Sequence, residues 1–198
     1  SPLRSLPAPR YSPGFLVNRL TMTAFNRLYF SVQSATRNRQ RVVDLNHYFF
    51  PLDRVRNWNT LYGPAGFVQY QFVVPPDNAR QAILAVLDET AQQGRDSFLC
   101  MLKKFGPENK NLLSFPMEGY TLALDFKIEK EIFTLLDRLD RVVVEHGGRL
   151  YLCKDARMSA STFQQTYPRW EDFRAVRAEV DPHGRFGSLQ SKRLGLSD

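Results

Sequence analysis

The sequence predicts an α+β fold of the ferredoxin-like (split βαβ) type, in which one antiparallel sheet carries its helices on one face. Between residues 67 and 152, segments with strand-like alternation and segments with helical spacing follow in the order strand, helix, strand, strand, helix, strand. Turns rich in glycine and proline separate these segments. A helical tail follows, so we expect three parts: residues 1–45, 46–152 and 153–198.

Composition fits a folded domain with anionic partners. The 198 residues are 43% hydrophobic and 13% aromatic, which is enough for a core and excludes a disordered chain. The net charge of +7 favours phosphate, nucleic acid or an acidic membrane surface, although the basic residues are scattered. No apolar stretch has the length of a membrane-spanning helix. Because the chain starts without Met or a signal pattern, we expect it to begin inside a longer protein.

The cysteines and histidines give no recognisable metal or hydrolase site. Cys100 and Cys153 form neither a ligand spacing nor a disulfide framework, and both are expected to be buried free thiols. The histidines, His47, His146 and His183, have no ligand spacing either. Free thiols suit a reducing compartment, so we expect a cytoplasmic protein.

The segment before the sheet is predicted to be an extended proline-rich arm over 1–13 and a helix over 15–30. A short helix over Asp53–Leu61, carrying Trp58, should lead into the sheet. One face of the first helix is expected to hold Leu16, Leu20, Phe25 and Leu28.

Residues 31–44 are predicted to form a loop with arginines at alternate positions, Arg37, Arg39 and Arg41. If the segment is extended, the guanidinium groups share one face and match phosphate geometry. A solvated loop without a ligand explains the same pattern, and the sequence does not decide between the two.

The strands and long helices of the sheet domain are delimited by their punctuation. Asp77 is a plausible N-cap for the first long helix, and Gly94 ends it. The predicted strands are Phe67–Val74, Ser97–Lys104, Tyr120–Lys127 and Arg149–Leu152. The predicted helices are Asp77–Gln93 and Ile128–His146, followed in the tail by Ser159–Thr166, Pro168–Val180 and Ser188–Leu194.

Polar side chains on one face of the predicted sheet form a candidate ligand site. Gln69 and Gln71 share one face of the first strand, Lys103 lies near the end of the second, and Thr121 and Asp125 lie on the third. Two amides and an ammonium could bind sugar hydroxyls and a phosphate. A sheet face that is simply open to solvent explains the same pattern, so both interpretations stand.

The stretch from Gly147 to Asp155 links the sheet to the tail. Two glycines permit a sharp turn after the long helix, and Arg149–Leu152 then delivers Lys154 to the end of the sheet. Taken alone, a lysine at such a place is a solvated surface charge.

The same stretch resembles the C-terminal segment of flavoenzymes of the vanillyl-alcohol-oxidase class. In the sugar-lactone oxidases the comparable stretch reads Arg-Pro-His-Trp-x-Lys; Arg149 and Lys154 keep that spacing, but Tyr151 and Leu152 replace His and Trp. The run Gly-Gly-Arg-Leu-Tyr-x-x-Lys-Asp is more similar to the decaprenylphosphoryl-ribose oxidases, which act on a lipid-linked ribose in arabinan synthesis. Further similar motifs are Phe50-Pro51-Leu52-Asp53, Gln69-Tyr70-Gln71-Phe72 and Leu113-Ser114-Phe115-Pro116.

The resemblance implies a cofactor and roles for the candidate residues. It implies FAD, with Tyr151 packed near the flavin ring and Lys154 stabilising negative charge on the reduced flavin. It also implies that Gln69, Gln71, Lys103 and Thr121 face the substrate. Ala123 stands where some of these enzymes carry cysteine, which excludes thiol chemistry at that position.

The partners follow from the same resemblance. The sequence has no glycine-rich diphosphate-binding loop, so we expect the FAD-binding domain to lie outside this chain and the chain alone not to retain FAD. The other implied partners are a phosphorylated or lipid-linked sugar and the reductase of an epimerase pair. Such a substrate implies that the protein is either free in the cytoplasm or peripheral to the inner membrane face.

A ferredoxin-like binding module without catalysis, for RNA or a small regulatory ligand, is the alternative function. RNA binding by the common route needs an aromatic pattern on the central strands. The strand beginning at Ser97 lacks this pattern and the Gln69/Gln71 face is rich in amides, so no nucleic acid is expected.

Overall fold

The computed structural model describes residues 6–7, 19–40, 42–45, 48, 55–95, 97 and 99–197. The chain forms two compact units. The N-terminal unit comprises the described residues up to Phe67 together with Lys127–Glu129, and the sheet unit comprises Val68–Phe126 and the chain from Lys130 onward. The three-part division at residues 45 and 152 stays a prediction.

The sheet unit is built on a four-stranded antiparallel sheet with the order β4-β5-β3-β6. Of the four strands, the first and third in sequence (β3 and β5) are adjacent at the centre of the sheet. The fourth (β6) lies beside the first, as the split βαβ arrangement requires. This confirms the predicted fold class. The strands are β3 (Phe67–Val74), β4 (Cys100–Phe105), β5 (Gly119–Lys127) and β6 (Arg149–Leu150).

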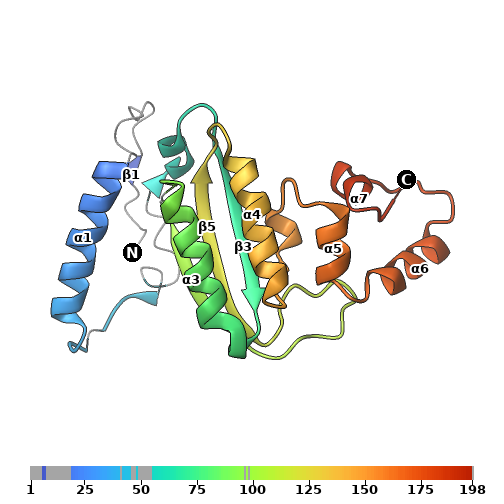
Figure 1. Ribbon diagram of the computed structural model, residues 1–198, viewed down its shortest axis with the longest axis horizontal. Helices are drawn as coiled ribbons and strands as arrows, with labels where there is room; N and C mark the ends of the chain where they lie inside the picture. Colours follow the sequence, from blue (N-terminus) through green and yellow to red (C-terminus); the bar gives the residue numbers. More distant parts are fainter. Residues whose placement is uncertain are drawn as a thin grey trace. The chain divides into compact units, whose positions relative to one another are not determined.

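Two long helices, α3 (Pro76–Gln92) and α4 (Ile132–Glu145), cover the same face of this sheet (Figure 1). Pro76 stands in the first turn of α3, where its missing N–H costs nothing, and Asp77 follows it in that turn instead of capping the helix. Alternate residues of the central strands point toward the helices and are buried. They are Val68, Tyr70, Phe72 and Val74 on β3, and Leu122, Leu124 and Phe126 on β5.

The opposite face of the central strands carries the polar candidates, because side chains alternate along a strand. Gln69 and Gln71 are only partly buried, whereas Thr121 and Asp125 are buried beneath their neighbours. The structure thus confirms the two-faced pattern that the alternation predicts.

Three element boundaries differ from the predicted ones. β4 begins at Cys100, not Ser97, because the Ser97 hydroxyl bonds the backbone N–H and carbonyl of Asp125. α4 begins at Ile132, not residue 128, since Glu131 adopts a left-handed conformation with φ 68°. β6 ends at Leu150, and residues Leu152–Lys154 form a short 3₁₀ turn, η4.

In the N-terminal unit, helix α1 covers Arg19–Thr36, so the predicted loop over 31–44 is wrong for its first six residues. The side chains of Leu20, Phe25 and Leu28, which are predicted to share an apolar face of this helix, are exposed. Leu16 and Arg41 lie outside the described residues.

The predicted helix over Asp53–Leu61 is not formed over its described part, which is a short strand followed by a 3₁₀ turn. Val55–Arg56 forms strand β2, which pairs in parallel with β1 (Leu6–Pro7), and a 3₁₀ turn, η3, covers Trp58–Tyr62. Asp53 lies outside the described residues. Tyr62 is buried, with its ring stacked on Phe67 at 4.5 Å between centroids.

The tail forms α5 (Ala160–Thr166), α6 (Trp170–Val180) and α7 (Leu189–Arg193), close to the predicted limits. Within the chain, α5 packs against α4 and β6 and buries Phe163. α6 buries none of its residues, and its Val176 is about half exposed.

Both cysteines are free but exposed, so the prediction that they are buried is wrong. Cys100 lies on the edge strand β4, and Cys153 lies in η4. Among the described residues, no helix combines the length and the apolar character that a membrane crossing needs.

Candidate functional site

The site begins at the glycine pair after α4. Gly147 has a φ of 70°, a conformation that favours glycine, and its N–H closes the helix on the carbonyl of Val144. Gly148 lies against the sheet so closely that a Cβ there would meet the Val73 carbonyl oxygen at 2.6 Å. The two glycines therefore turn the chain and let β6 come up beside β3, as the sequence predicts.

β6 sets the position of Lys154. Arg149 and Leu150 pair with Val73 and Phe72, and the Tyr151 N–H donates to the Gln71 carbonyl at 2.9 Å. The chain then leaves β3 in the η4 turn, whose last residue is Lys154. Lys154 consequently lies in a turn, not at the end of a strand. It is beside the first part of β3, which β6 does not pair with.

A small pocket at this edge brings together four of the predicted site residues, Gln69, Gln71, Tyr151 and Lys154. The Lys154 ammonium has no ion-pair or hydrogen-bond partner among the described residues, and the side chain is only partly buried. A cation that lines the same pocket as two amides and a phenol ring can bind an anionic or electron-rich group.

Each glutamine of β3 is held by a residue of β5. The Gln69 amide nitrogen donates to the Asp125 carboxylate at 3.0 Å, and the Gln71 amide nitrogen donates to the Thr121 hydroxyl at 3.0 Å. A carboxylate only accepts hydrogen bonds, so it fixes which end of the Gln69 amide faces it. The carbonyl oxygen of Gln69 is left to accept from a ligand, as a sugar hydroxyl would require.

Lys103 is on the same sheet face but outside this pocket. It pairs with Thr121 across β4 and β5, it is exposed, and it does not line the pocket. Ala123 lies on the same face of β5, opposite Met101. Lys104 pairs with Tyr120, so it points to the other face of the sheet.

Aromatic rings border the pocket on the Tyr151 side. Tyr151 stacks on Phe115 with 4.4 Å between ring centroids, and Phe105 meets Phe115 edge to face. The hydrogen bond with Cys153, the charge of that thiol and desolvation raise the pKa of Tyr151 above its ordinary value. Tyr151 is therefore a neutral ring at physiological pH.

Arg149, which the resemblance marks, is structural in this arrangement. Its guanidinium donates to Glu108 at 2.7 Å and to the Ser114 carbonyl at 2.5 Å. It also lies over the Tyr167 ring. Arg149 is buried, so it ties the loop between β4 and β5 to β6 and does not face the Lys154 pocket.

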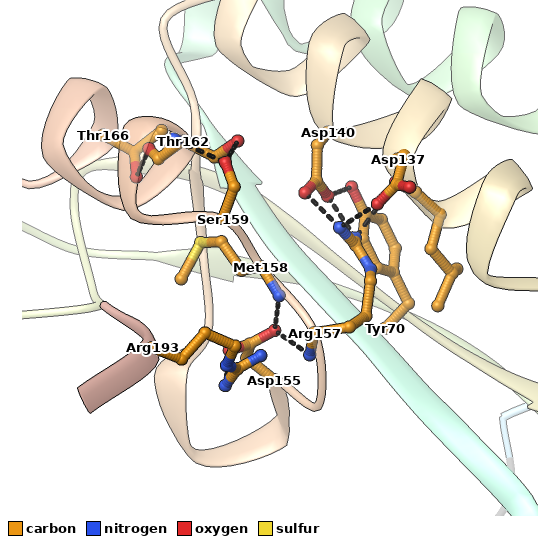
Figure 2. Close-up of polar contacts among 11 residues, drawn as sticks. Tyr70, Asp137, Asp140, Asp155, Arg157, Met158, Ser159, Thr162, Thr166 and Arg193 are labelled. Carbon is orange, nitrogen blue, oxygen red and sulfur yellow. Dashed lines mark hydrogen bonds and ion pairs between the residues drawn. The ribbon is translucent and has the colours of Figure 1, made fainter. Parts of the chain in front are cut away.

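A polar network that the sequence did not predict includes two residues that line the pocket, Tyr70 and Arg157 (Figure 2). Arg157 donates to both oxygens of Asp140, at 2.5 and 2.6 Å, and to the Leu136 carbonyl. Tyr70 donates to the same carboxylate at 3.0 Å. Burial, and after it the Asp140 charge, raises the pKa of Tyr70 well above its ordinary value. This network joins β3, α4 and the chain after η4.

Asp155, next to Lys154, is the second centre of this network. One carboxylate oxygen accepts from the backbone N–H groups of Arg157 and Met158, and the other accepts from Arg193 at 2.8 Å. Figure 2 shows Arg193 reaching Asp155 from α7. One signal was available in the sequence: Asp140 stands four residues after Leu136, on the inward face of α4, where a charge needs a partner.

The residues around Lys154 fit the ring end of a flavin and not its diphosphate end. An ammonium without an anionic partner beside a flat aromatic ring suits a group that gains negative charge on reduction. The sequence has no glycine-rich phosphate loop. The described residues also contain no cluster of His, Cys, Asp or Glu that could hold a metal ion.

Comparison with known proteins finds that the chain is similar to a sugar-lactone oxidase family and to three proteins of known sequence. Residues 121–194 match the D-arabinono-1,4-lactone oxidase family. Over 96% of its length the chain is 39% identical to decaprenylphosphoryl-beta-D-ribose oxidase of Mycolicibacterium smegmatis, and it covers 41% of that protein. It is 31% identical to an uncharacterised protein of Streptomyces coelicolor, again over 96% of the chain and 53% of the relative.

A more distant relative is the L-gulono-1,4-lactone dehydrogenase of Mycobacterium tuberculosis. It is 22% identical over 65% of this chain and 30% of its own length. The chain thus spans about half or less of the curated relatives that it matches.

Proposed function

We propose that this chain forms the substrate-binding part of a FAD-dependent oxidoreductase that oxidises a sugar CH–OH group. Its similarity to a ribose oxidase and to sugar-lactone oxidising proteins supports the proposal. The proposed substrate is a polyprenyl-phosphoryl ribose or a related sugar. The observation that carries the proposal is the pocket in which Lys154 lies beside Gln69, Gln71 and Tyr151.

The proposed roles follow from the chemistry of each group. The carbonyl oxygen of Gln69, left available by the bond to Asp125, accepts from a sugar hydroxyl. Gln71, held by Thr121, contributes a second amide on the same strand face. Lys103, exposed at the border of that face, attracts the phosphate of a phosphorylated sugar.

Lys154 has an electrostatic role in this proposal. FAD, when bound, supplies the acceptor for the hydride that leaves the carbinol carbon. The Lys154 ammonium would stabilise the negative charge that develops, because a preorganised charge in a site with little water needs no reorganisation. Tyr151, as a neutral ring, would pack beside the flavin and help to exclude water.

The proposal includes partners outside the chain. A FAD-binding domain supplies the diphosphate site, and without it we expect this chain to be inactive and not to retain FAD. A lipid-linked substrate places the protein at the inner face of the membrane, as a peripheral protein. A reductase that completes an epimerisation is the proposed enzyme partner, and cell-wall synthesis the proposed context.

The test is an oxidation assay on a protein that joins this chain to its FAD-binding domain. We expect polyprenyl-phosphoryl ribose to reduce an artificial electron acceptor in the presence of this protein, and the isolated chain to give no turnover and no yellow colour. If none of the ribose, arabinose and lactone derivatives tested reduces and so bleaches the flavin, the proposed reaction is contradicted.

A further inference from the structure

We infer that α7, at the C-terminal end of the chain, positions Lys154 through Gln190 and Arg193, so that these two side chains are positioning residues of the proposed reaction. The inference rests on the proposed function for the role of Lys154. It concerns residues for which neither the sequence pattern nor the resemblance predicts a part in the site.

The η4 turn needs help from side chains because it is short. It comprises Leu152–Lys154 and lies beyond the end of β6, so no strand ladder holds it. Its own backbone gives only two contacts, from the Lys154 N–H to the Tyr151 carbonyl at 3.0 Å and from the Asp155 N–H to the Leu152 carbonyl at 3.2 Å. A turn of this size is stable only when neighbouring groups fix it.

Two contacts from α7 bracket Lys154 on either side. The Gln190 amide donates to the Leu152 carbonyl at 2.7 Å, two residues before Lys154. Arg193 donates to the Asp155 carboxylate at 2.8 Å, one residue after Lys154. Both donors stand on one helix, so a movement of α7 moves both ends of the η4 turn.

Asp155 makes the Arg193 contact more than a surface ion pair. The Asp155 side chain is only 5% exposed, whereas Arg193 is 28% exposed. Removing Arg193 would leave a buried carboxylate oxygen without its charged partner, and burial of an unpaired charge is costly. The turn would then relax to bring Asp155 to water, and Lys154 would move with it.

α7 is itself fixed, so it can act as a support. Ser188 and Ser191 form a reciprocal capping box at its start. The residues just after it, Leu194 and Leu196, are buried. The support of Lys154 is therefore anchored at both ends of the helix.

The experiment uses the flavin-loaded protein that contains this chain, with the variants Arg193→Met, Gln190→Leu and Arg193→Lys. A displaced catalytic group costs rate steeply, so we expect kcat to fall on the order of tenfold or more in Arg193→Met, with a smaller change in KM. We also expect the reduction potential of the flavin to become more negative, in the direction that Lys154→Ala changes it. Arg193→Lys restores part of both values.

Lys192→Met is the matched control, since Lys192 lies on the same helix but is exposed. Combining Arg193→Met with Lys154→Ala should lower kcat no further than Lys154→Ala alone, because both act through one group. In the isolated chain, hydrogen exchange of the Lys154 amide should quicken in Arg193→Met and Gln190→Leu but not in Lys192→Met. This measurement remains decisive if a variant loads flavin poorly.

Two results separate the inference from the proposed function. If Lys154→Ala lowers kcat and the potential while Arg193→Met and Gln190→Leu match Lys192→Met, the inference is overturned and the proposed function stands. If the Lys154 amide exchanges faster but Lys154→Ala changes neither kcat nor the potential, the proposed role of Lys154 is overturned and the contact with α7 stands.

Discussion

At the scale of single residues, alternation along strands predicted which side chains share a face but not what holds them. Gln69 and Gln71 lie on one face, as the pattern of β3 requires. Their bonds to Asp125 and Thr121 depend on the register between β3 and β5, which lie about fifty residues apart in sequence. Lys103 is on the predicted face, yet it lies on β4, two strands away from the β3 residues that line the pocket.

Lys154→Ala should lower turnover far more than stability. Its side chain is partly exposed in a turn, so truncation opens no cavity in the core. A preorganised charge of this kind contributes about 3 kcal/mol to the transition state, on the order of a hundredfold in kcat. Steady-state kinetics of the flavin-loaded protein, with the thermal unfolding midpoint measured alongside, would check this.

Lys104→Ala is the control for this change, because Lys104 is exposed on the opposite face of β4. We expect its kcat to equal that of the unmodified protein. Lys154→Arg should restore little, since a planar guanidinium does not replace a compact ammonium in a small pocket. Near-normal turnover of Lys154→Ala would mean that Lys154 is an ordinary surface charge.

At the scale of elements, existence and order could be predicted from the sequence, whereas several boundaries could not. Period and punctuation identified β3 to the residue, α3 to within a residue and the antiparallel order. The start of β4 was missed because Ser97 bonds Asp125 across the sheet, a contact that no local pattern carries. The exposure of Leu20, Phe25 and Leu28 on α1 could not be predicted, because helical spacing indicates amphipathicity but not burial.

The contact between α4 and the chain after η4 should depend on Asp140. Asp140→Ala leaves the Arg157 guanidinium, 14% exposed, without its main partner. Breaking a buried pair by removing one member costs roughly 3–5 kcal/mol. Urea denaturation at neutral pH measures this loss. Asp137→Ala is the control: Asp137 contacts the same arginine but is 65% exposed, so its loss should cost less than about 1 kcal/mol.

The junction between α4 and β6 should not tolerate a side chain at Gly148. A Cβ there would meet the Val73 oxygen at 2.6 Å and methyl groups of Val74 and Val143 at 2.7 and 2.8 Å. Overpacking of this kind costs about 1–3 kcal/mol, and the β3–β6 pairing would shift. Gly106→Ala is the matched control, since nothing lies within 4 Å of its added Cβ. Equal unfolding free energies for the two variants would contradict the close approach.

At the scale of the whole chain, the tail and the sheet form one unit through side-chain hydrogen bonds more than through strands. The Tyr167 hydroxyl donates to the Leu150 carbonyl at 2.5 Å, Arg193 reaches Asp155, and Phe163 is buried against α4 and β6. Such contacts leave no periodic signature in the sequence, so the packing of the tail on the sheet could not be predicted from it. The candidate site depends on them, because they surround the turn that carries Lys154.

The buried tyrosines at this junction should make stability fall in alkali. Burial raises the pKa of Tyr70, and likewise that of Tyr167, above the ordinary value near 10. The unfolded chain therefore releases their protons near pH 10 while the folded protein keeps them. Their contribution to stability is complete below pH 10 and is lost as the pH rises from there toward the folded pKa, by about 1.4 kcal/mol per pH unit for each tyrosine.

Urea unfolding of the chain and of Tyr70→Phe between pH 7 and pH 11 tests this expectation. At pH 7 the variant should be less stable by about 1 kcal/mol, because its ring no longer donates to Asp140. Above pH 10 its free energy of unfolding should fall less steeply than that of the unmodified chain, so the two curves converge. Tyr29→Phe, which removes a hydroxyl from an exposed ring on α1, is the control. Parallel curves for Tyr70→Phe and the unmodified chain above pH 10 would mean that the Tyr70 hydroxyl reaches water, and that the network joining β3, α4 and Arg157 opens in solution.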